Sequence, residues 1–311
     1  MLNKISIVGG AGRVGETTGV YLAQAELCRE LMLVDVRAGA PEGAALDIAQ
    51  SRNYYRSDTR VDGSSDPAAV AGSDLIVVTA GLPRQPGMSR SDVLGKNVAI
   101  IDTVIDAALA HAPDAMMLIV SNPVDVMTWR VCQRTGWARS RVIGQAGVLD
   151  AARMAHFIAL ETGFSMKDIT TIVLGGHGDT MVPVQRLCTV NGIPVETFIG
   201  AQRMAQIIQR TRDGGAEVLK LRGNSSAYDA PAASVAAMVD AIAFNRRRIM
   251  PSVAILDGEY GQSGIAMGVP CVLGAGGIER VVELELTNAE QAAFATSAGA
   301  VREDIDRLPT P

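Results

Sequence analysis

Short, uninterrupted apolar runs alternate with segments of helical periodicity throughout the first half of the chain. Each run is rich in Ile, Val and Leu, and such runs are typical of parallel strands buried on both faces of a sheet. The alternation therefore predicts a doubly wound α/β domain, in which ligands bind at the carboxyl ends of the parallel strands. The predicted strands are Ile5 to Gly9, Leu31 to Val36, Asp74 to Ala80 and Met116 to Ser121.

The pattern changes after about Gly144. Leu149 to Glu161 has the periodicity of an amphipathic helix, and segments 169–175 and 182–195 are typical of antiparallel strands with an Asn191-Gly192 turn. We therefore predict a doubly wound domain over residues 1–144 and a mixed α+β domain over residues 145–311, with a ligand cleft between them. The second domain is expected to hold long helices at 197–221, 231–247 and 287–308 and strands near 253–256 and 269–273.

Composition narrows the class of protein. Of the 311 residues, 48% are hydrophobic and 20% are charged, and the chain lacks the apolar stretch of ~20 residues that a membrane-spanning helix needs. A net charge of -5 without basic runs argues against nucleic acid as a partner. The first residues lead into a strand without the features of a secretory signal, so we expect a cytoplasmic protein. The widely spaced cysteines predict reduced thiols and no metal site: Cys28, Cys132, Cys188 and Cys271.

A glycine-rich turn follows the first predicted strand and opens a helix. Gly10, Gly12 and Gly15 have the spacing that permits a tight turn, close approach of the backbone to a pyrophosphate, and close packing of helix on strand. Asp35 ends the second strand, where a carboxylate can accept hydrogen bonds from both adenosine ribose hydroxyls and repels a 2′-phosphate. Together they predict a Rossmann domain that binds NAD in preference to NADP. The structural alternative is a glycine turn beside an ordinary strand-end aspartate.

Further strand ends are expected to meet at the same edge of the sheet. Thr79 and Gly81 follow one predicted strand, and Asn122 follows the next. Asn122 could orient the nicotinamide ribose or the substrate, and the alternative is a turn-forming asparagine before a proline; the sequence leaves both open. The cofactor crevice is expected to include Arg13, Val14, Asn97 and Val120 as well.

One of the three histidines has the setting of a catalytic acid and base. His177 lies in the segment Gly175 to Asp179, at the end of a predicted strand where glycines bring the backbone close to a ligand, and an imidazole exchanges protons near neutral pH. Asp150 and Arg153 are three residues apart and share one helix face. Asp150 can hold His177 in one tautomer, and Arg153 can bind a carboxylate. The alternative for this pair is an intrahelical salt bridge.

The segment 81–90 carries two arginines, Arg84 and Arg90, directly after a predicted buried strand. A guanidinium keeps its charge at working pH and matches a carboxylate with a planar fork, so two of them in one loop favour a small acidic ligand. A solvated surface loop explains the same two residues equally well when they are taken alone. The neighbouring motifs favour the acidic ligand.

These motifs occur in the order found in the lactate and malate dehydrogenase family, which the chain resembles over nearly its whole length. Within that family it is similar to the bacterial malate dehydrogenases that resemble lactate dehydrogenases. The resemblance implies that His177 gives and takes the proton, Asp150 is its partner and Arg153 anchors the C1 carboxylate. It also implies that Arg90 polarises the keto oxygen and that Arg84 contacts the far end of the substrate. The matching segments are the glycine turn, 79–81, 84–90, 121–125, 148–153 and 175–179.

The resemblance further implies reversible, NAD-dependent oxidation of (S)-malate to oxaloacetate by hydride transfer. These dicarboxylates pair with Arg153 and Arg84, whereas lactate would leave Arg84 unpaired in a closed site. The alternative is a lactate or other 2-hydroxy acid dehydrogenase; an NAD-dependent glycosidase and a non-catalytic role are weaker alternatives. The resemblance also implies a homodimer or homotetramer and a role in the tricarboxylic acid cycle. The helix predicted at 231–244 is either a subunit contact or part of the core.

Overall fold

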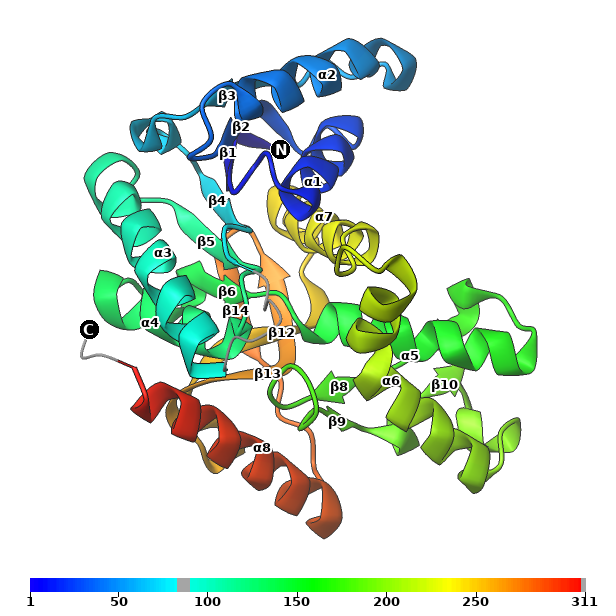
Figure 1. The fold of residues 1–311 in the computed structure, drawn as a ribbon. Helices are drawn as coiled ribbons and strands as arrows, with labels where there is room; N and C mark the ends of the chain where they lie inside the picture. The colour runs from blue at the N-terminus through cyan, green and yellow to red at the C-terminus, as the bar shows by residue number, and fades with distance from the viewer. Residues whose placement is uncertain (83–89, 309–311) are drawn as a thin grey trace.

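Among the described residues, nine strands form one continuous sheet through the centre of the molecule, with helices on both of its faces (Figure 1). The computed structural model describes residues 1–82 and 90–308, and within these ranges it describes every side chain except those of residues 90–92. The strand order is β14-β13-β12-β6-β5-β4-β1-β2-β3. The sheet is therefore built from both halves of the chain.

The parallel half of the sheet comes from the first part of the chain and confirms the doubly wound fold. Ile5 and Ile7 point into a hydrophobic cluster on one face, whereas Ile76 and Val78 point into a second cluster on the other face. Burial on both faces explains the uninterrupted apolar runs. The strands are β1 (Leu2–Val8), β2 (Cys28–Val34), β3 (Arg60–Ser64), β4 (Leu75–Val78), β5 (Met116–Ile119) and β6 (Val142–Gly144).

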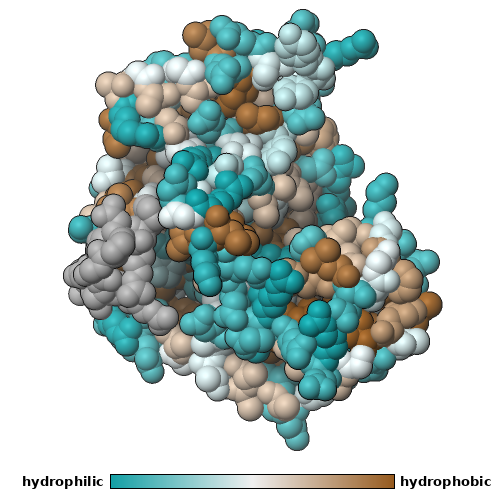
Figure 2. Space-filling view, turned by 45° about the vertical axis from the view of Figure 1, so that its right-hand side comes forward, coloured by the Kyte–Doolittle hydropathy of each residue, from teal (hydrophilic) through white to brown (hydrophobic). Residues whose placement is uncertain are grey.

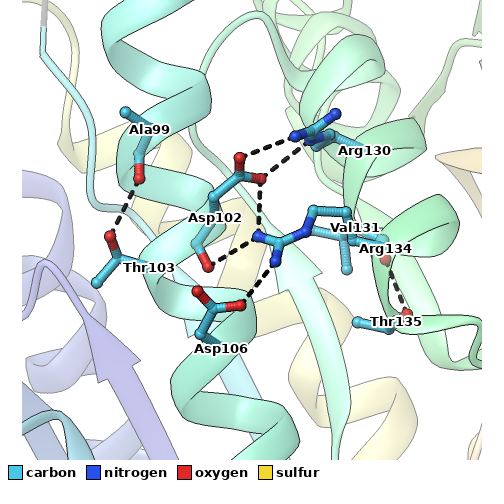
Figure 3. Close-up of polar contacts among 8 residues, drawn as sticks. All are labelled: Ala99, Asp102, Thr103, Asp106, Arg130, Val131, Arg134 and Thr135. Carbon is cyan, nitrogen blue, oxygen red and sulfur yellow. Dashed lines mark hydrogen bonds and ion pairs between the residues drawn. The ribbon is translucent and has the colours of Figure 1, made fainter. Parts of the chain in front are cut away.

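Four helices accompany these strands, and two of them are joined by a cluster of charged side chains (Figure 3). Asp102 accepts two hydrogen bonds from Arg130, at 3.0 and 2.9 Å, and lies 3.2 Å from Arg134, which also binds Asp106 at 2.8 Å. The cluster fixes α3 against α4, the two helices that begin beside the carboxyl edge of the sheet. The helices are α1 (Arg13–Gln24), α2 (Ala40–Tyr55), α3 (Arg90–His111) and α4 (Val124–Thr135).

The second half of the chain extends the same sheet in the antiparallel sense. β12 pairs with β6 at Val253 and Gly144, β13 pairs with β12 along most of its length, and β14 follows β13. The strands predicted near 253–256 and 269–273 are thus confirmed but are longer, and nothing in the sequence pattern indicates that they join the first sheet. Their bounds are β12 (Arg248–Asp257), β13 (Ser263–Gly274) and β14 (Gly277–Val281).

Small antiparallel strands and four long helices complete the second half. Asn191 and Gly192 form the predicted turn between β10 and β11, with φ values of 49° and 82°. The strands are β7 (Ile169–Thr170), β8 (Val173–Leu174), β9 (Val182–Pro183), β10 (Thr189–Val190) and β11 (Ile193–Pro194), and the helices are α5 (Gly147–Thr162), α6 (Ala201–Arg222), α7 (Asp229–Ala243) and α8 (Asn288–Asp306).

Helix α7 packs into the core beside α1, as Figure 1 shows. Val235, Met238 and Val239 are completely buried, so core packing explains the apolar character of this segment. The helix ends at Ala243, four residues earlier than predicted, because the chain turns through positive φ angles at the residues that follow.

The surface is mixed in polarity, and hydrophobic side chains form small groups between hydrophilic ones on the face seen in Figure 2. In the described parts of the chain, every helix is too short or too polar to cross a bilayer. The four cysteines are free thiols, three of them buried. Burial raises the pKa of Cys28 to about 12, so that thiol stays protonated.

Candidate active site

The glycine turn joins β1 to α1 and leaves the start of the helix open. The N–H groups of Gly9 and Gly10 donate to the carbonyl of Val34 at 2.8 and 3.0 Å, and the N–H of Gly12 donates to the carbonyl of Gly9 at 2.9 Å. Gly12 is the N-cap of α1 and offers no side-chain cap, so the first N–H groups of the helix can bind an anion. The first residues of that helix are Arg13 and Val14.

Three positions of this turn, Gly9, Gly10 and Gly15, have room for glycine alone. A Cβ atom on Gly15 would lie 2.3 Å from the carbonyl oxygen of Gly9, and one on Gly10 would lie 2.8 Å from the carbonyl oxygen of Ile7. Contacts below 3.0 Å with backbone force the backbone to shift. The turn is therefore tight because the helix packs directly on it, as the glycine spacing predicts.

Asp35 lies just beyond β2, at the same edge of the sheet, and is 9% exposed. Its carboxylate accepts hydrogen bonds from the Ala11 N–H at 3.2 Å and from the Arg37 side chain at 3.1 Å. Partial burial opposes ionisation, but the hydrogen bonds and charge of Arg37 together with the Ala11 N–H outweigh it and hold the pKa of Asp35 below its usual range. A negative charge beside the glycine turn is therefore maintained at neutral pH.

The other predicted strand ends lie close together. The Asn97 side chain is buried, accepts from the Leu82 N–H at 2.8 Å and donates to the Asn122 carbonyl at 2.8 Å, so it ties α3 to both strand ends. The Thr79 hydroxyl donates to the Gly9 carbonyl at 3.2 Å, which links its strand end to the glycine turn. Asn122 is exposed, Gly81 borders the Asn97 side chain, and Val120 is half-buried at the end of β5.

His177 and Asp150 are 27 residues apart in sequence and form a direct pair. The Nδ1 atom of His177 donates to Oδ2 of Asp150 at 2.8 Å, which leaves Nε2 as the free ring nitrogen. The other oxygen of Asp150 accepts from Arg153 at 3.2 Å. Asp150 is 1% exposed, whereas the side chains of His177 and Arg153 are 20% and 15% exposed. The three side chains therefore form one unit whose reactive ends reach solvent.

Three elements hold the main chain around His177. The His177 N–H donates to Oδ2 of Asp125 on α4 at 2.9 Å, and the Gly176 N–H donates to the Ser297 hydroxyl on α8 at 2.8 Å. Gly175 exchanges two backbone hydrogen bonds with Gly268 of β13. Sequence reasoning assigns no role to Asp125 or Ser297. The position of Asp125 three residues after Asn122 is a signal for the first, and the sequence offers none for the second.

The two carboxylates shift the titration of the imidazole. The negative charge of Asp150 is the largest cause of a raised His177 pKa, its hydrogen bond and the charge of Asp125 add to it, and burial and Arg153 oppose it. Burial raises the pKa of Asp125 from 3.8 to about 6, against the hydrogen bond and charge of His177. Oδ1 of Asp125 has no hydrogen-bond partner among the described residues.

The two arginines of the loop fall outside this description. Arg84 lies outside the described residues, and Arg90 is the first residue of α3 but its side chain is not described. The roles predicted for both, and the catalytic and cofactor-binding roles of the other residues, stay predictions.

Comparison with known proteins identifies the family. Residues 3–144 match the model of the lactate/malate dehydrogenase NAD-binding domain, and residues 147–309 match that of the lactate/malate dehydrogenase α/β C-terminal domain. The chain belongs to the lactate/malate dehydrogenase family. It is accordingly an NAD-dependent oxidoreductase, as its motifs predict.

Relatives within the lactate/malate dehydrogenase family include enzymes named for each substrate. A malate dehydrogenase of Thioalkalivibrio sulfidiphilus is 59% identical over 99% of this chain and all of the relative. The malate dehydrogenase structure from Salinibacter ruber is 41% identical, with a TM-score of 0.94 over 98% of this chain and 97% of that one. A Cryptosporidium parvum lactate dehydrogenase in complex with lactic acid and NAD is 33% identical, also with a TM-score of 0.94, over 99% of both chains. The shared backbone therefore leaves the substrate to individual side chains.

Proposed function

We propose that the protein is a malate dehydrogenase, which catalyses the reversible, NAD-dependent oxidation of (S)-malate to oxaloacetate. The observation that carries the proposal is the buried Asp150 carboxylate, which binds the His177 imidazole with one oxygen and the Arg153 guanidinium with the other. A proton-transferring group and a carboxylate-binding group are thus held side by side. The malate dehydrogenases among the relatives support the choice of substrate.

The residues at the carboxyl edge of the parallel sheet fit NAD. The uncapped start of α1 suits the pyrophosphate, and Asp35 suits the adenosine ribose. Asn122 is proposed to lie near the nicotinamide end. When it is bound there, NAD supplies the acceptor for the hydride from C2 of the substrate.

His177 is proposed to move the proton. With Nδ1 bonded to Asp150, the neutral ring presents Nε2 to the substrate hydroxyl and accepts its proton. The imidazolium that forms is stabilised by Asp150, which is already in contact and already charged, so the pair needs little rearrangement in the transition state. In the reverse direction the protonated ring returns the proton to the keto oxygen of oxaloacetate.

The arginines are proposed to orient the dicarboxylate. Arg153 binds the C1 carboxylate, Arg84 the far carboxylate, and Arg90 the oxygen on C2, where negative charge develops. The roles of Arg84 and Arg90 rest on the sequence and the family resemblance. A substrate without the second carboxylate would leave the Arg84 charge unpaired when water is excluded.

The ratio of kcat/KM for oxaloacetate to that for pyruvate, measured with NADH, tests the proposal. We expect the parent to favour oxaloacetate by ~10³-fold or more, and Arg84→Gln to reduce this ratio sharply while raising pyruvate turnover. Arg203→Gln is a matched control, because Arg203 is 54% exposed on α6 and pairs with Glu161. If Arg84→Gln keeps the parental preference for oxaloacetate, Arg84 does not determine the choice of substrate.

The second candidate is a lactate or other 2-hydroxy acid dehydrogenase. The similarity of the backbone to a lactate dehydrogenase bound to lactic acid favours it, because the same proton-transferring pair serves either substrate. A parent enzyme that prefers pyruvate in the same assay would establish this function and exclude malate.

We also propose a division into a cofactor domain over residues 1–144 and a catalytic domain over 145–311, a cytoplasmic location, a role in the tricarboxylic acid cycle, and a homodimer or homotetramer. The ranges of the two family models support the division. Exposed Leu46 and Tyr54 on α2 and Leu221 on α6 support a subunit contact. Light scattering on the eluting peak of a sizing column measures the assembly, and a monomer there would contradict that part.

A further inference from the structure

The carboxylate of Asp35 has hydrogen-bond donors on both oxygens within the chain itself. Oδ1 accepts from the N–H and the Nε of Arg37 at 3.3 and 3.1 Å, and Oδ2 accepts from the Ala11 N–H at 3.2 Å and from Nη2 of Arg37 at 3.4 Å. A carboxylate has about four lone-pair positions. These contacts therefore fill its hydrogen-bonding capacity, and the Arg37 side chain takes up half of it.

Two ribose hydroxyls that bind Asp35 must replace the Arg37 side chain. The Arg37 side chain is 59% exposed, whereas Asp35 is 9% exposed, so the guanidinium regains its hydration when it leaves the carboxylate. Its backbone is only two residues from Asp35, so the released guanidinium stays near the ribose. The chain that follows Arg37 is uncrowded at Gly39, where a Cβ would meet no atom within 4 Å. Glu16 on α1 is a further carboxylate whose charge acts on Arg37.

We propose that Arg37 is a cofactor-specificity residue, a cation already placed beside the 2′ position of the adenosine ribose, and that the ion pair with Asp35 prevents it from binding a 2′-phosphate. A guanidinium matches a phosphate with the same planar fork that it now presents to Asp35. In the parent, Arg37 competes with the ribose hydroxyls for the carboxylate. Without the Asp35 charge, Arg37 becomes a phosphate ligand. This inference goes beyond the proposed reaction, because it concerns the cofactor alone.

The dissociation constants of NADH and NADPH, measured by the fluorescence of the bound nicotinamide without substrate, test this role. Asp35→Ser is expected to bind NADPH at least ~10-fold more tightly than the parent, and Asp35→Ser with Arg37→Gln is expected to lose that gain. Arg37→Gln alone is expected to bind NADH about two- to fivefold more tightly, because the ribose no longer displaces an ion pair.

Two further variants make the test independent of folding and of general charge effects. Asp35→Asn preserves the shape of the side chain and is expected to show the same dependence on Arg37 as Asp35→Ser. Arg60→Gln is the control, because Arg60 is 68% exposed and pairs with Glu30 towards the amino ends of β2 and β3, away from Asp35, so its loss should leave both constants unchanged. Thermal melts monitored by circular dichroism verify that each variant is folded.

Equal NADPH affinity with and without Arg37, in both the serine and the asparagine background, would overturn the proposal. Weaker NADH binding by Arg37→Gln would overturn it as well, since Arg37 would then assist the ribose. Neither constant involves malate or oxaloacetate. An error in the proposed reaction would therefore leave this test intact.

Discussion

Asp125→Asn is expected to make the protein more stable at neutral pH. The parent carboxylate is 5% exposed, accepts the His177 N–H with one oxygen and has no partner for the other among the described residues. Asparagine keeps an oxygen for the His177 N–H and removes a buried charge. The substitution therefore separates the structural role of the acceptor from the cost of the charge.

The size of the gain follows from the pKa of Asp125. Burial raises this pKa from 3.8 to about 6, and each pKa unit corresponds to about 1.4 kcal/mol. The folded protein holds the proton at pH values where the unfolded chain has released it, so the cost is absent below pH 3.8 and complete above about pH 6. At pH 7 the parent loses about 3 kcal/mol, and at pH 4 only about 0.5 kcal/mol.

Urea titrations of parent and variant between pH 4 and pH 7 measure this difference. Asp125→Asn should gain up to about 3 kcal/mol in the free energy of unfolding at pH 7 and little at pH 4. Asp168→Asn, an exposed carboxylate beside β7, changes the net charge equally and should show no such trend. A variant that gains nothing at pH 7, or whose gain is the same at both pH values, would refute the reasoning. The variant should also lower the pKa of His177, because the charge of Asp125 contributes to its rise.

Three other substitutions probe the site and its support. Asp150→Asn removes a hydrogen bond to a charged group and should lower kcat/KM by ~10- to 100-fold, equally in both directions because the overall equilibrium is unchanged. Because the charge of Asp150 raises the pKa of His177, the variant should also lower the pH at which oxaloacetate reduction declines. An unmoved pH profile would contradict this. Asp102→Asn should lower the free energy of unfolding, measured by urea titration, by about 3 kcal/mol, because Asp102 binds two arginines of α4. Asp106→Asn is the control: the Asp106 side chain is 64% exposed, so its loss should lower that free energy by less than about 1 kcal/mol. Similar losses in the two variants would argue against a stabilising role of the cluster. Gly15→Ala should weaken NADH binding by ~10-fold or more, because its Cβ meets backbone at 2.3 Å, whereas Gly299→Ala in α8 meets no atom within 4 Å and should leave binding intact.

Elements with a strong local pattern are the ones that the sequence predicts. The runs at β1, β2, β4 and β5 are buried on both faces, so their apolar character needs no knowledge of their neighbours. β3 escapes notice because Val61 is its only buried side chain, and β6 because it has three residues. The pairing of β6 with β12 joins residues more than 100 positions apart, and no local pattern encodes it.

The residues of the candidate site also fall into those that the sequence predicts and those that it does not. The glycine turn and Asp35 were predictable because strand, turn and helix follow one another in sequence, and backbone sterics allow few residues there. His177, Asp150 and Arg153 were identified as separate residues from their types and spacing. The sequence did not predict the distances between them. It also did not indicate a role for Asp125, which binds His177 across 52 positions, or for Ser297, which binds Gly176 across 121 positions.

The sequence alone determined the class of fold and the binding of NAD, and it predicts the reacting groups, because each depends on residue types over short stretches of chain. The tertiary structure decided how those groups work together. Packing of α4, α8 and β13 around Gly175 to His177 sets the imidazole beside Asp150 and a second buried carboxylate at Asp125. The folded chain also brings the Arg37 guanidinium into a hydrogen bond with the Asp35 carboxylate. Electrostatic coupling depends on distance and burial, and only the folded chain sets these.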